Sequence, residues 1–574
     1  MSGARRMLAA ALVMGGLAFA LTGASSKTGA KAPALHTGAM PNATIQALLH
    51  SKIKYVFVIY QENHSFDSEF GTYPGADGVY SDAARAHGFT QKNPVDGTDV
   101  TPFRITDPDV ADVDHTRQTL VKKMSGGRMD RFVETEAAIY QGRGASPAMA
   151  AGMGDSTMLH IDCDAIPYLW TYAHRFTLFD RFFQGMTGPS TPGNIEIIAG
   201  QTGLTQAARH PEQVADPDDR GPGVPVVNDL FPNYGPFNVS RPYAHRQVDL
   251  TFVNVLLELE QRDALAVVND NYDVRQDESA IAKAQADPVG WAWYQEGYAD
   301  PNDPKHLTYI THHNAPQYFG YVMTNRTMLR HLADLRQFET DLQEGRLPDR
   351  GLFFVKGGFK NILGLEPANP QLRALGAFRG DDDHPAYSDQ QISEALVAHM
   401  VNAIARSRYW KDSAIIITWD DSEGYWDHVP PPVFEQCPDA APCGDGPRVP
   451  AIVISPFAKS GAIVHEMDDT ASVPKFVETV FGLPAMASLP DEKPYLPRGP
   501  RDGDPRIGDL SGAFDLGRLQ GKRQPLPASA ALIPESVVMS IPSPWNCAKI
   551  GIAPVPPPAG TSDAPPAGYS PRPK

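Results

Sequence analysis

Three short apolar runs stand out along this chain, and the first two stop abruptly at polar residues. They read YVFVIY (55–60), AIIITW (414–419) and RVPAIVISP (448–456). Continuous apolar runs of this length, rich in β-branched residues, are typical of strands buried on both faces. Such strands predict a largely parallel sheet that is covered on both sides.

Between these runs, apolar residues recur at helical spacing. SDQQISEALVAHMVNAIARS (388–407) has the pattern of an amphipathic helix with Ser388 as its N-cap. DTASVPKFVETVFGL (469–483) predicts a helix that stops near Gly482, and AIPYLWTYAHRFTLFDRFF (165–183) predicts a helix leading into a short strand. Buried strands that alternate with helices predict a three-layer α/β fold, with a mostly parallel sheet and helices on both faces.

The first 24 residues have the layout of an export signal. Arg5 and Arg6 precede an apolar run over 7–21, and small residues follow up to Ala24. The run is too short and too bluntly ended for a membrane span, so we expect no transmembrane anchor. Cleavage near Ala24 predicts an exported protein, periplasmic or extracellular, with a flexible start over 25–44.

Composition divides the rest of the chain into parts. We expect a catalytic domain over 45–515 and a C-terminal extension over 516–574. Within the domain, residues 210–300 are rich in Asp, Pro and Asn and predict an inserted cap over the ligand edge of the sheet. The final segment, GIAPVPPPAGTSDAPPAGYSPRPK (551–574), is Pro-rich and predicts a disordered tail.

Charge and cysteine content narrow the class of protein. The 574 residues include 67 acidic and 50 basic ones, a formal charge of −17, which disfavours nucleic-acid binding because attraction to phosphate requires a basic face. Four cysteines are consistent with an oxidising compartment. Cys437 and Cys443 are spaced for a local disulfide, whereas Cys163 and Cys547 either pair with each other or stay free.

The polar residues after the apolar runs predict a metal site. Glu62 and Asn63 follow the first run, and Asp420 and Asp421 follow the second. If the two strands are neighbours, these side chains meet at one rim, where adjacent anions need a counter-charge. Either pair alone favours a helix cap or a turn, but both pairs at matched strand ends favour a divalent cation. Oxygen ligands suit Ca²⁺, Mg²⁺ or Mn²⁺, and histidines would admit Zn²⁺ or Fe.

Hydroxyl and imidazole groups supply candidates for the chemistry. Ser190 and Thr191 lie on a turn in GPSTPG, before a helical or strand-like segment, where a hydroxyl beside a metal can attack an electrophile. Taken alone, this segment is an ordinary Ser/Thr-rich turn. Histidines recur in acid-rich loops, where they can bind metal, donate a proton or contact an anion. They are His115, His312, His313, His384 and His428.

Together these segments resemble the bacterial phospholipase C and acid phosphatase family of secreted phosphoesterases, within the alkaline phosphatase-like superfamily. The resemblance rests on VIYQENHSFDSEFGTYPG, DVDHTRQTLVKKMSGGRMDRFV, IPYLWTYAHRFTLFDRFF, GPSTPGN, HHNAPQYF, DDDHPAYS, SRYWKDSAIIITWDDSEGYWDHVPPP and GPRVPAIVISPFAKSG. These pieces occur in the family's order, which makes the match more specific than any single motif. They span residues 54–482.

The resemblance implies roles for particular residues. The implied metal ligands are Glu62, Asn63, Asp420 and Asp421. The implied nucleophile is Ser190. The histidines implied to contact the phosphoryl group or to protonate the leaving oxygen are His115, His313 and His384.

The chain departs from the family's pattern at three places. Gly193 stands where Asn is common, so the register of the motif is open and Thr191 is the alternative nucleophile. His312 is the alternative to His313, which we prefer for its place directly before an asparagine. The stretch DDSEG (420–424) is closer to the acid phosphatase branch than to the phospholipases.

The sequence therefore predicts a secreted, metal-dependent hydrolase of phosphate esters, of acid phosphatase type, that works through a serine nucleophile and a phosphoenzyme. Its expected partner is a small phosphoester or phospholipid substrate, and phospholipase C is the first alternative. A catalytically silent, metal-stabilised binding protein is the second. A sulfatase-like hydrolase is disfavoured because Ser190 is not followed by the arginine of a Cys/Ser-x-Pro-x-Arg motif. No motif sets the metal, the pH optimum or the oligomeric state.

Overall fold

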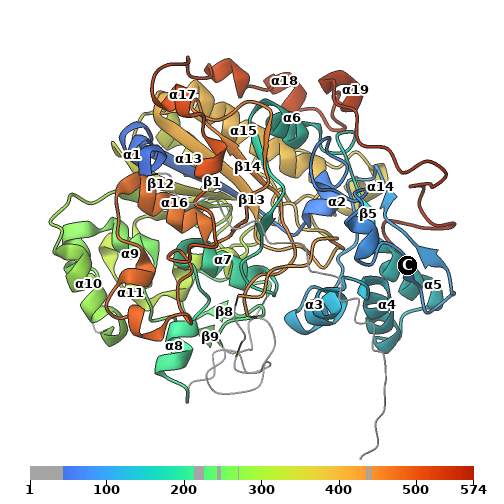
Figure 1. Ribbon diagram of the computed structural model, residues 1–574, viewed down its shortest axis with the longest axis horizontal. Coiled ribbons are helices and arrows are strands. Elements are labelled where there is room, and N and C mark those ends of the chain that lie inside the picture. Colours follow the sequence, from blue (N-terminus) through green and yellow to red (C-terminus); the bar gives the residue numbers. More distant parts are fainter. Residues whose placement is uncertain (1–42, 213–224, 242–246, 269–270, 435–436, 438–442) are drawn as a thin grey trace, which may run out of the picture. The chain divides into compact units, whose positions relative to one another are not determined.

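A sheet of eight strands forms the centre of the fold (Figure 1). The strands are β1 (Tyr55–Gln61), β6 (Thr177–Phe179), β10 (Gly290–Gln295), β11 (Leu332–Asp334), β12 (Gly351–Lys356), β13 (Ser413–Trp419), β14 (Ala451–Ile454) and β15 (Ala462–Val464). Their order across the sheet is β11-β10-β12-β1-β13-β14-β6-β15. β14 runs antiparallel to both neighbours and the other pairings are parallel, which confirms the mostly parallel sheet.

The structure is a computed structural model that describes residues 43–212, 225–241, 247–268, 271–434, 437 and 443–574. The predicted export signal over 1–24 and nearly all of the predicted flexible start lie outside the described residues. The described residues belong to one contact-defined unit, without a break at the predicted boundary near 515.

The register of the central strands sets the position of the polar residues that follow them. β1 and β13 pair in parallel from Tyr55 opposite Ser413 to Gln61 opposite Trp419. Every residue of both strands is buried, as expected for strands covered on two faces. Because the two strands end level with each other, the residues that follow them emerge side by side at one edge of the sheet.

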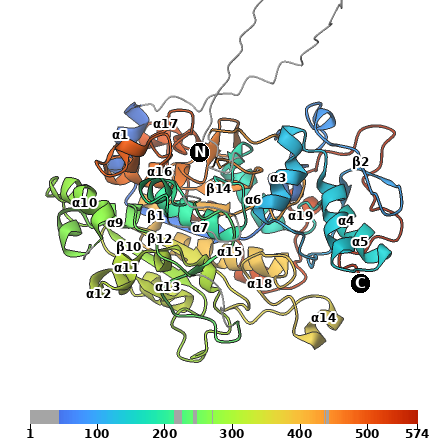
Figure 2. The same ribbon diagram turned by 90° about the horizontal axis from the view of Figure 1, so that it is seen from below.

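Helices cover the sheet on both sides. Four of them are α1 (Ala43–Lys52), α13 (Leu335–Gln343), α15 (Gln390–Arg406) and α16 (Ser472–Phe481). Figure 2 shows α1 and α16 on one side of the strands and α13 and α15 on the other, which confirms the three-layer fold. The N-cap of α15 is Asp389, whose carboxylate accepts from the amide of Gln391 at 2.9 Å, and not Ser388 as predicted. No helix among the described residues has the length and apolar character needed to cross a membrane.

The predicted insertion is shorter than the pattern suggested. Its described part contains β8 (Phe231–Pro232), β9 (Gln247–Val248), α9 (Val255–Leu259) and α10 (Arg275–Ala282). β10, however, pairs with β11 and β12 inside the central sheet, so the insertion ends before residue 290. Trp291 and Trp293 are buried there, and this burial overrides the polar composition around the strand.

The Pro-rich C-terminal segment contains neither helix nor strand, yet it packs against the body of the protein. Arg572 pairs with Asp107 at 2.8 Å, and the ring of Tyr569 packs edge-on against Phe103, 4.7 Å away. In Figure 1 the segment runs to the chain end beside α4 (Phe132–Gly142) and α5 (Pro147–Ser156). This differs from the predicted disordered tail, because side-chain contacts hold an extended chain that has no ladder of its own.

Two disulfides are present among the described residues. Cys437 pairs with Cys443, as predicted, and Cys163 pairs with Cys547, one of the two outcomes left open by the sequence. The second bridge spans 384 positions and ties the C-terminal extension to the loop before α6 (Pro167–Arg175).

Buried carboxyl groups outside the central sheet should make the free energy of unfolding depend on pH. Asp468 is 2% exposed, and burial raises its pKa to about 8. Between its unfolded pKa, about 3.9, and its folded pKa, the folded protein binds a proton that the unfolded chain has lost. The contribution of Asp468 to stability is therefore fully present below about pH 4 and is lost as the pH rises toward its folded pKa of about 8.

We expect the Asp468→Asn variant to lose part of this dependence. From pH 5 to 7 the unfolding free energy of the wild type should fall, and the variant should fall less steeply by about 1 kcal/mol per pH unit. Asp504→Asn is the matched control, since Arg506 holds the pKa of Asp504 below its usual value and outside this window. Urea unfolding at several pH values measures both slopes, and equal slopes for wild type and Asp468→Asn would contradict the assignment.

Candidate active site

The residues predicted to act together meet at the carboxyl ends of β1 and β13. Ser190 is the first residue of α7 (Ser190–Ala199), and its Oγ lies 3.0 Å from Glu62 Oε2 and 3.2 Å from Asp421 Oδ2. Asn63 Oδ1 lies 3.4 Å from the same hydroxyl. All four side chains are at most 1% exposed. A strand-end cluster and a helix N-terminus thus come together around one oxygen.

Gly193 explains how α7 approaches the strand end so closely. A Cβ at this position would lie 2.4 Å from the carbonyl oxygen of Asp420, so only glycine fits there. The amide of Asn194, one residue later, donates to Asp420 Oδ2 and to the carbonyl of Ser190, both at 2.9 Å. The glycine that departs from the family pattern therefore shifts the asparagine by one position without removing its contact with the cluster.

Asn63 is held by a residue that was not among the predicted site residues. Its backbone is left-handed, with φ of 55°, and its Nδ2 donates to Glu423 Oε2 at 2.9 Å. This bond leaves the amide oxygen directed to Ser190. Glu423 lies in the same DDSEG stretch as Asp421, so the acidic run itself was the available signal.

Thr191, the alternative nucleophile, points elsewhere. Its hydroxyl donates to the carbonyl of Leu230 at 3.3 Å, and its backbone amide donates to Asp229 at 3.0 Å. The geometry therefore favours Ser190 for the role of nucleophile.

Lys356 was not among the predicted site residues, although it lies within the cluster. It ends β12, is 1% exposed, and pairs with Glu62 Oε1. Its signal was a lysine at the end of the apolar run GLFFVK. One ammonium does not balance the three carboxylates of Glu62, Asp420 and Asp421.

The residues fit a divalent cation. Burial raises the pKa of Glu62 well above its usual value, with the charge of Asp420 next in size, and it raises that of Asp421 to about 8. The single proton of the Ser190 hydroxyl can serve only one of its three oxygen neighbours at a time. Carboxylate, amide and hydroxyl oxygens are a suitable ligand set for such an ion.

His313 is the member of its histidine pair that faces the cluster. Its Nδ1 lies 3.1 Å from Glu62 Oε1 and 3.9 Å from Asp382 Oδ2. The three side chains could also hold a metal ion together. His312 instead packs its ring edge-on against Phe231, 5.7 Å away.

His115 and His384 lie beside each other, with ring centres 5.8 Å apart, and both are partly exposed. Burial disfavours charge on His115, but nearby carboxylates, Asp421 foremost, outweigh it and raise the pKa to about 9. Burial lowers the pKa of His384 to about 4. At neutral pH His115 is thus the charged member of the pair. His428 lies in a separate buried network, 2.6 Å from Asp67.

A family model described as the phosphoesterase family matches residues 53–484, well over half of the chain. The chain belongs to the phosphoesterase family. The matched segment contains every predicted site residue, and the match confirms the resemblance derived from the motifs.

Curated relatives of this phosphoesterase are phospholipases C. A non-hemolytic phospholipase C of Burkholderia pseudomallei is 22% identical over 84% of this chain and 62% of its own length. Phospholipase C B of Mycobacterium tuberculosis is 23% identical over 81% of this chain and 78% of its own. Non-specific phospholipase C1 of Arabidopsis thaliana is 29% identical over 33% of this chain and 36% of its own. The chain thus aligns with less than two thirds of the Burkholderia protein.

Solved structures show a weaker likeness. An alkaline phosphatase superfamily protein from Vibrio parahaemolyticus matches 77% of this chain and 76% of its own at 9% identity, with a TM-score of 0.28. A phosphonate monoester hydrolase of Agrobacterium radiobacter matches 75% and 74% at 12% identity, with a TM-score of 0.28. At these values, the α/β assignment of this phosphoesterase rests on its own sheet topology.

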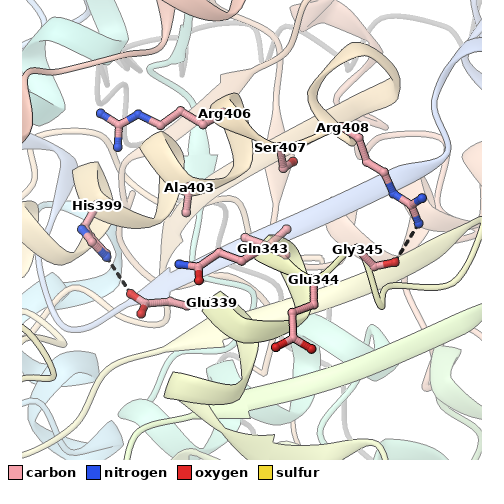
Figure 3. Close-up of a pocket in the computed structure, with 10 residues that line it drawn as sticks. Glu339, Gln343, Glu344, Gly345, His399, Ala403, Arg406, Ser407 and Arg408 are labelled. Atoms are coloured by element: carbon pink, nitrogen blue, oxygen red, sulfur yellow. Dashed lines mark hydrogen bonds and ion pairs between the residues drawn. The ribbon is translucent and has the colours of Figure 1, made fainter.

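A pocket of about 480 Å³ lies away from the cluster, between α13 and α15. In Figure 3 the side chains of Glu339 and His399 meet across it, 2.6 Å apart. Ser407 and Arg408 also line it, and they precede β13 at the amino end of the strand. This pocket of the phosphoesterase therefore lies at the opposite edge of the sheet from Ser190 and contains none of the predicted site residues.

Proposed function

We propose that this chain is a metal-dependent phosphoester hydrolase in which Ser190 attacks phosphorus. The observation that carries the proposal is the position of Ser190 Oγ, which lies at a helix N-terminus within 3.0–3.4 Å of three strand-end side chains. A hydroxyl held in this way can act as a nucleophile once its proton is accepted by a neighbouring base. The phospholipase C names of the relatives support phosphoester chemistry.

The residues that would hold the metal are Glu62, Asn63, Asp420 and Asp421. A bound divalent ion would supply Lewis acidity, lowering the pKa of the nucleophile and offsetting negative charge on the phosphoryl oxygens. The candidate ions are Ca²⁺, Mn²⁺, Zn²⁺, Mg²⁺ and Fe.

Other steps of the proposed reaction are proton transfers by side chains of this protein. Either Glu62 or Asp421 accepts the one hydroxyl proton of Ser190, and Lys356 keeps Glu62 in place. His115, charged at neutral pH, donates a proton to the leaving oxygen. Water then hydrolyses the phosphoserine.

His313 and His384 are assigned to the phosphoryl oxygens. His313 reaches the cluster from beside Glu62, whereas His384 lies at the partly exposed side with His115. An acidic protein that binds an anion needs local positive charge, and the protonated histidine, the lysine and the ion provide it.

For the substrate we retain the acid phosphatase type as the first candidate, because the DDSEG stretch resembles that branch. Cleavage of a phospholipid headgroup is the second candidate, and the names of the bacterial and plant relatives favour it. We also propose export, on the basis of the N-terminal sequence. A silent, metal-stabilised protein remains the alternative that activity assays address.

Hydrolysis of two chromogenic substrates tests the proposal. We expect the purified protein, without residues 1–24, to cleave p-nitrophenyl phosphate faster than p-nitrophenylphosphorylcholine, and to lose activity with a chelator. Faster cleavage of the choline ester would instead assign it to the phospholipases C. Bound metal without hydrolysis of either ester, across acidic to neutral pH, would overturn the enzymatic proposal.

A further inference from the structure

A second buried polar cluster lies next to the candidate active site and plays no part in the proposed chemistry. It consists of His64, Glu69 of α2 (Phe66–Phe70) and Asp383, which are 1%, 0% and 2% exposed. His64 Nε2 lies 4.0 Å from Glu69 Oε1 and 4.0 Å from Asp383 Oδ2. One nitrogen or oxygen from each residue lies within 4.8 Å of the others, as in a three-ligand metal site.

Several atoms of this cluster have no hydrogen-bond partner. No donor reaches either carboxylate oxygen of Glu69, Oδ1 of Asp383 or Oε1 of the adjacent Gln390. The carboxyl groups of Glu69 and Asp383 are close enough to share a proton. Gln390, the first residue of α15, is 2% exposed and reaches His64 Nε2 through its amide nitrogen at 3.0 Å. Buried polar atoms are normally paired, so this concentration of unpaired acceptors calls for a partner.

The cluster also lacks a balancing charge. Within the described part of the chain, His64 is the sole basic side chain within 4.0 Å of either carboxylate. Two buried carboxylates and an imidazole form a ligand set that can be neutralised by a cation or by protons.

The number of unpaired acceptors distinguishes these two possibilities. A proton shared by Glu69 and Asp383 satisfies one pair of oxygens and leaves the other acceptors unpaired. A divalent cation binds four or more ligands at once, at about 2.0–2.4 Å from each, and ligand atoms 4.0 Å apart leave room for it. Binding at His64 Nε2 would displace the contacts of this nitrogen with the Gln390 amide, 3.0 Å away, and with the Asp383 carbonyl, 3.2 Å away. We propose that His64, Glu69 and Asp383 hold a second, structural divalent cation, separate from the one proposed beside Ser190.

The donor set defines the class of ion. One imidazole with two carboxylates suits a borderline cation such as Zn²⁺ or Mn²⁺ better than Ca²⁺ or Mg²⁺. The surroundings already orient the ligands, because the indole of Trp419 donates to Asp383 Oδ2 at 2.9 Å and the ring of Tyr425 stacks on His64 at 5.5 Å. Such outer contacts are typical of metal ligands.

The position of the second site gives the ion a structural role. Asn63 and Asp383 have left-handed backbones, with φ of 55° and 84°. At these turns successive side chains go to different clusters: Asn63 to Ser190 and His64 to the second cluster, Asp382 toward His313 and Asp383 away from it. An ion that binds both loops would hold the two of them in register.

Metal stoichiometry tests the proposal. We expect metal-free protein, titrated with Zn²⁺ or Mn²⁺ and analysed by elemental analysis, to bind two equivalents. Glu69→Gln should bind one equivalent, because the amide keeps the volume but removes the charge, and Asp383→Asn should do the same. Glu258→Gln is the matched control, since Glu258 is also fully buried with two unpaired oxygens but lies outside the cluster.

The two metal sites are separable in the same experiment. Glu62→Gln should lose only the ion at the active site, so failure of the proposed catalytic site and failure of the second site give different results. X-ray absorption by the Zn²⁺ retained in Glu62→Gln should show an imidazole ligand. One equivalent in the wild type, with none lost in Glu69→Gln, would overturn the second site. The stoichiometry of the wild type shows whether a second cation binds, even if a variant does not fold.

Discussion

Replacing Ser190 with Ala should reduce turnover of p-nitrophenyl phosphate by about 10³-fold or more, because the reaction would lose its attacking oxygen. The metal content should stay close to that of the wild type. Glu62, Asn63 and Asp421 surround the hydroxyl but are held by other groups, including Lys356 and Glu423. Steady-state kinetics and elemental analysis of the same preparation give the two readouts.

Thr191→Val is the matched control for this variant. It removes the neighbouring hydroxyl, which donates to the carbonyl of Leu230 and not to the cluster. We expect its turnover to stay within about tenfold of the wild type. Near-normal activity in Ser190→Ala together with a large loss in Thr191→Val would transfer the role of nucleophile to Thr191.

The largest effect on stability is expected at Arg448, which is completely buried. Its Nε lies 2.9 Å from Asp427 Oδ1 and its Nη2 lies 2.9 Å from Asp67 Oδ1. Nη1 donates to the carbonyls of Asp180 and Asp77 at 2.7 and 2.8 Å. One guanidinium thus joins the segment after β1, the segment after β13 and the segment before α7.

Replacing Arg448 with Met should lower the free energy of unfolding by about 3–5 kcal/mol, because it leaves buried carboxylates without their counter-charge. Arg506→Met is the control, since Arg506 is 49% exposed and pairs with Asp504 at the surface. Its cost should stay below about 1 kcal/mol. Urea unfolding curves compare the two, and equal losses would show that burial of the ion pair is not what matters.

The sequence was informative at the strand ends for a simple physical reason. A strand that must be buried on both faces cannot carry Glu62 or Asp420 in its interior, so the place where polarity returns marks the edge of the sheet. Parallel pairing of β1 and β13 then brings the two sets together. The pattern contained this information because burial and strand length are local properties.

The sequence pattern did not predict the roles of Lys356, Glu423 and Asp382. Each was visible as a polar residue beside an apolar run or among other acids, but its role depends on a partner far away in the sequence. Lys356 meets Glu62 across 294 positions, and Asn63 meets Glu423 across 360. Side-chain contacts of this kind depend on which strands are neighbours, and no local period reports that.

The prediction of a disordered C-terminal tail differs most from the structure. Proline content predicted disorder because such a chain forms neither a helix nor a ladder. Arg572 and Tyr569 nevertheless find Asp107 and Phe103 on a distant part of the chain. Composition describes what a segment can form alone, and not which surface another segment offers to it.

By itself, the sequence determined the α/β layering, the strand-end acids, the hydroxyl motif and the family, since these depend on periodicity and on short motifs. The tertiary structure alone decided that β10 belongs to the sheet and that Ser190 rather than Thr191 faces the carboxylates. It also brought His64, Glu69 and Asp383 together. The reason is that the order of strands and the position of helices depend on packing between segments hundreds of residues apart. Gly193 is an example, because the absence of a Cβ there lets α7 approach the backbone of Asp420.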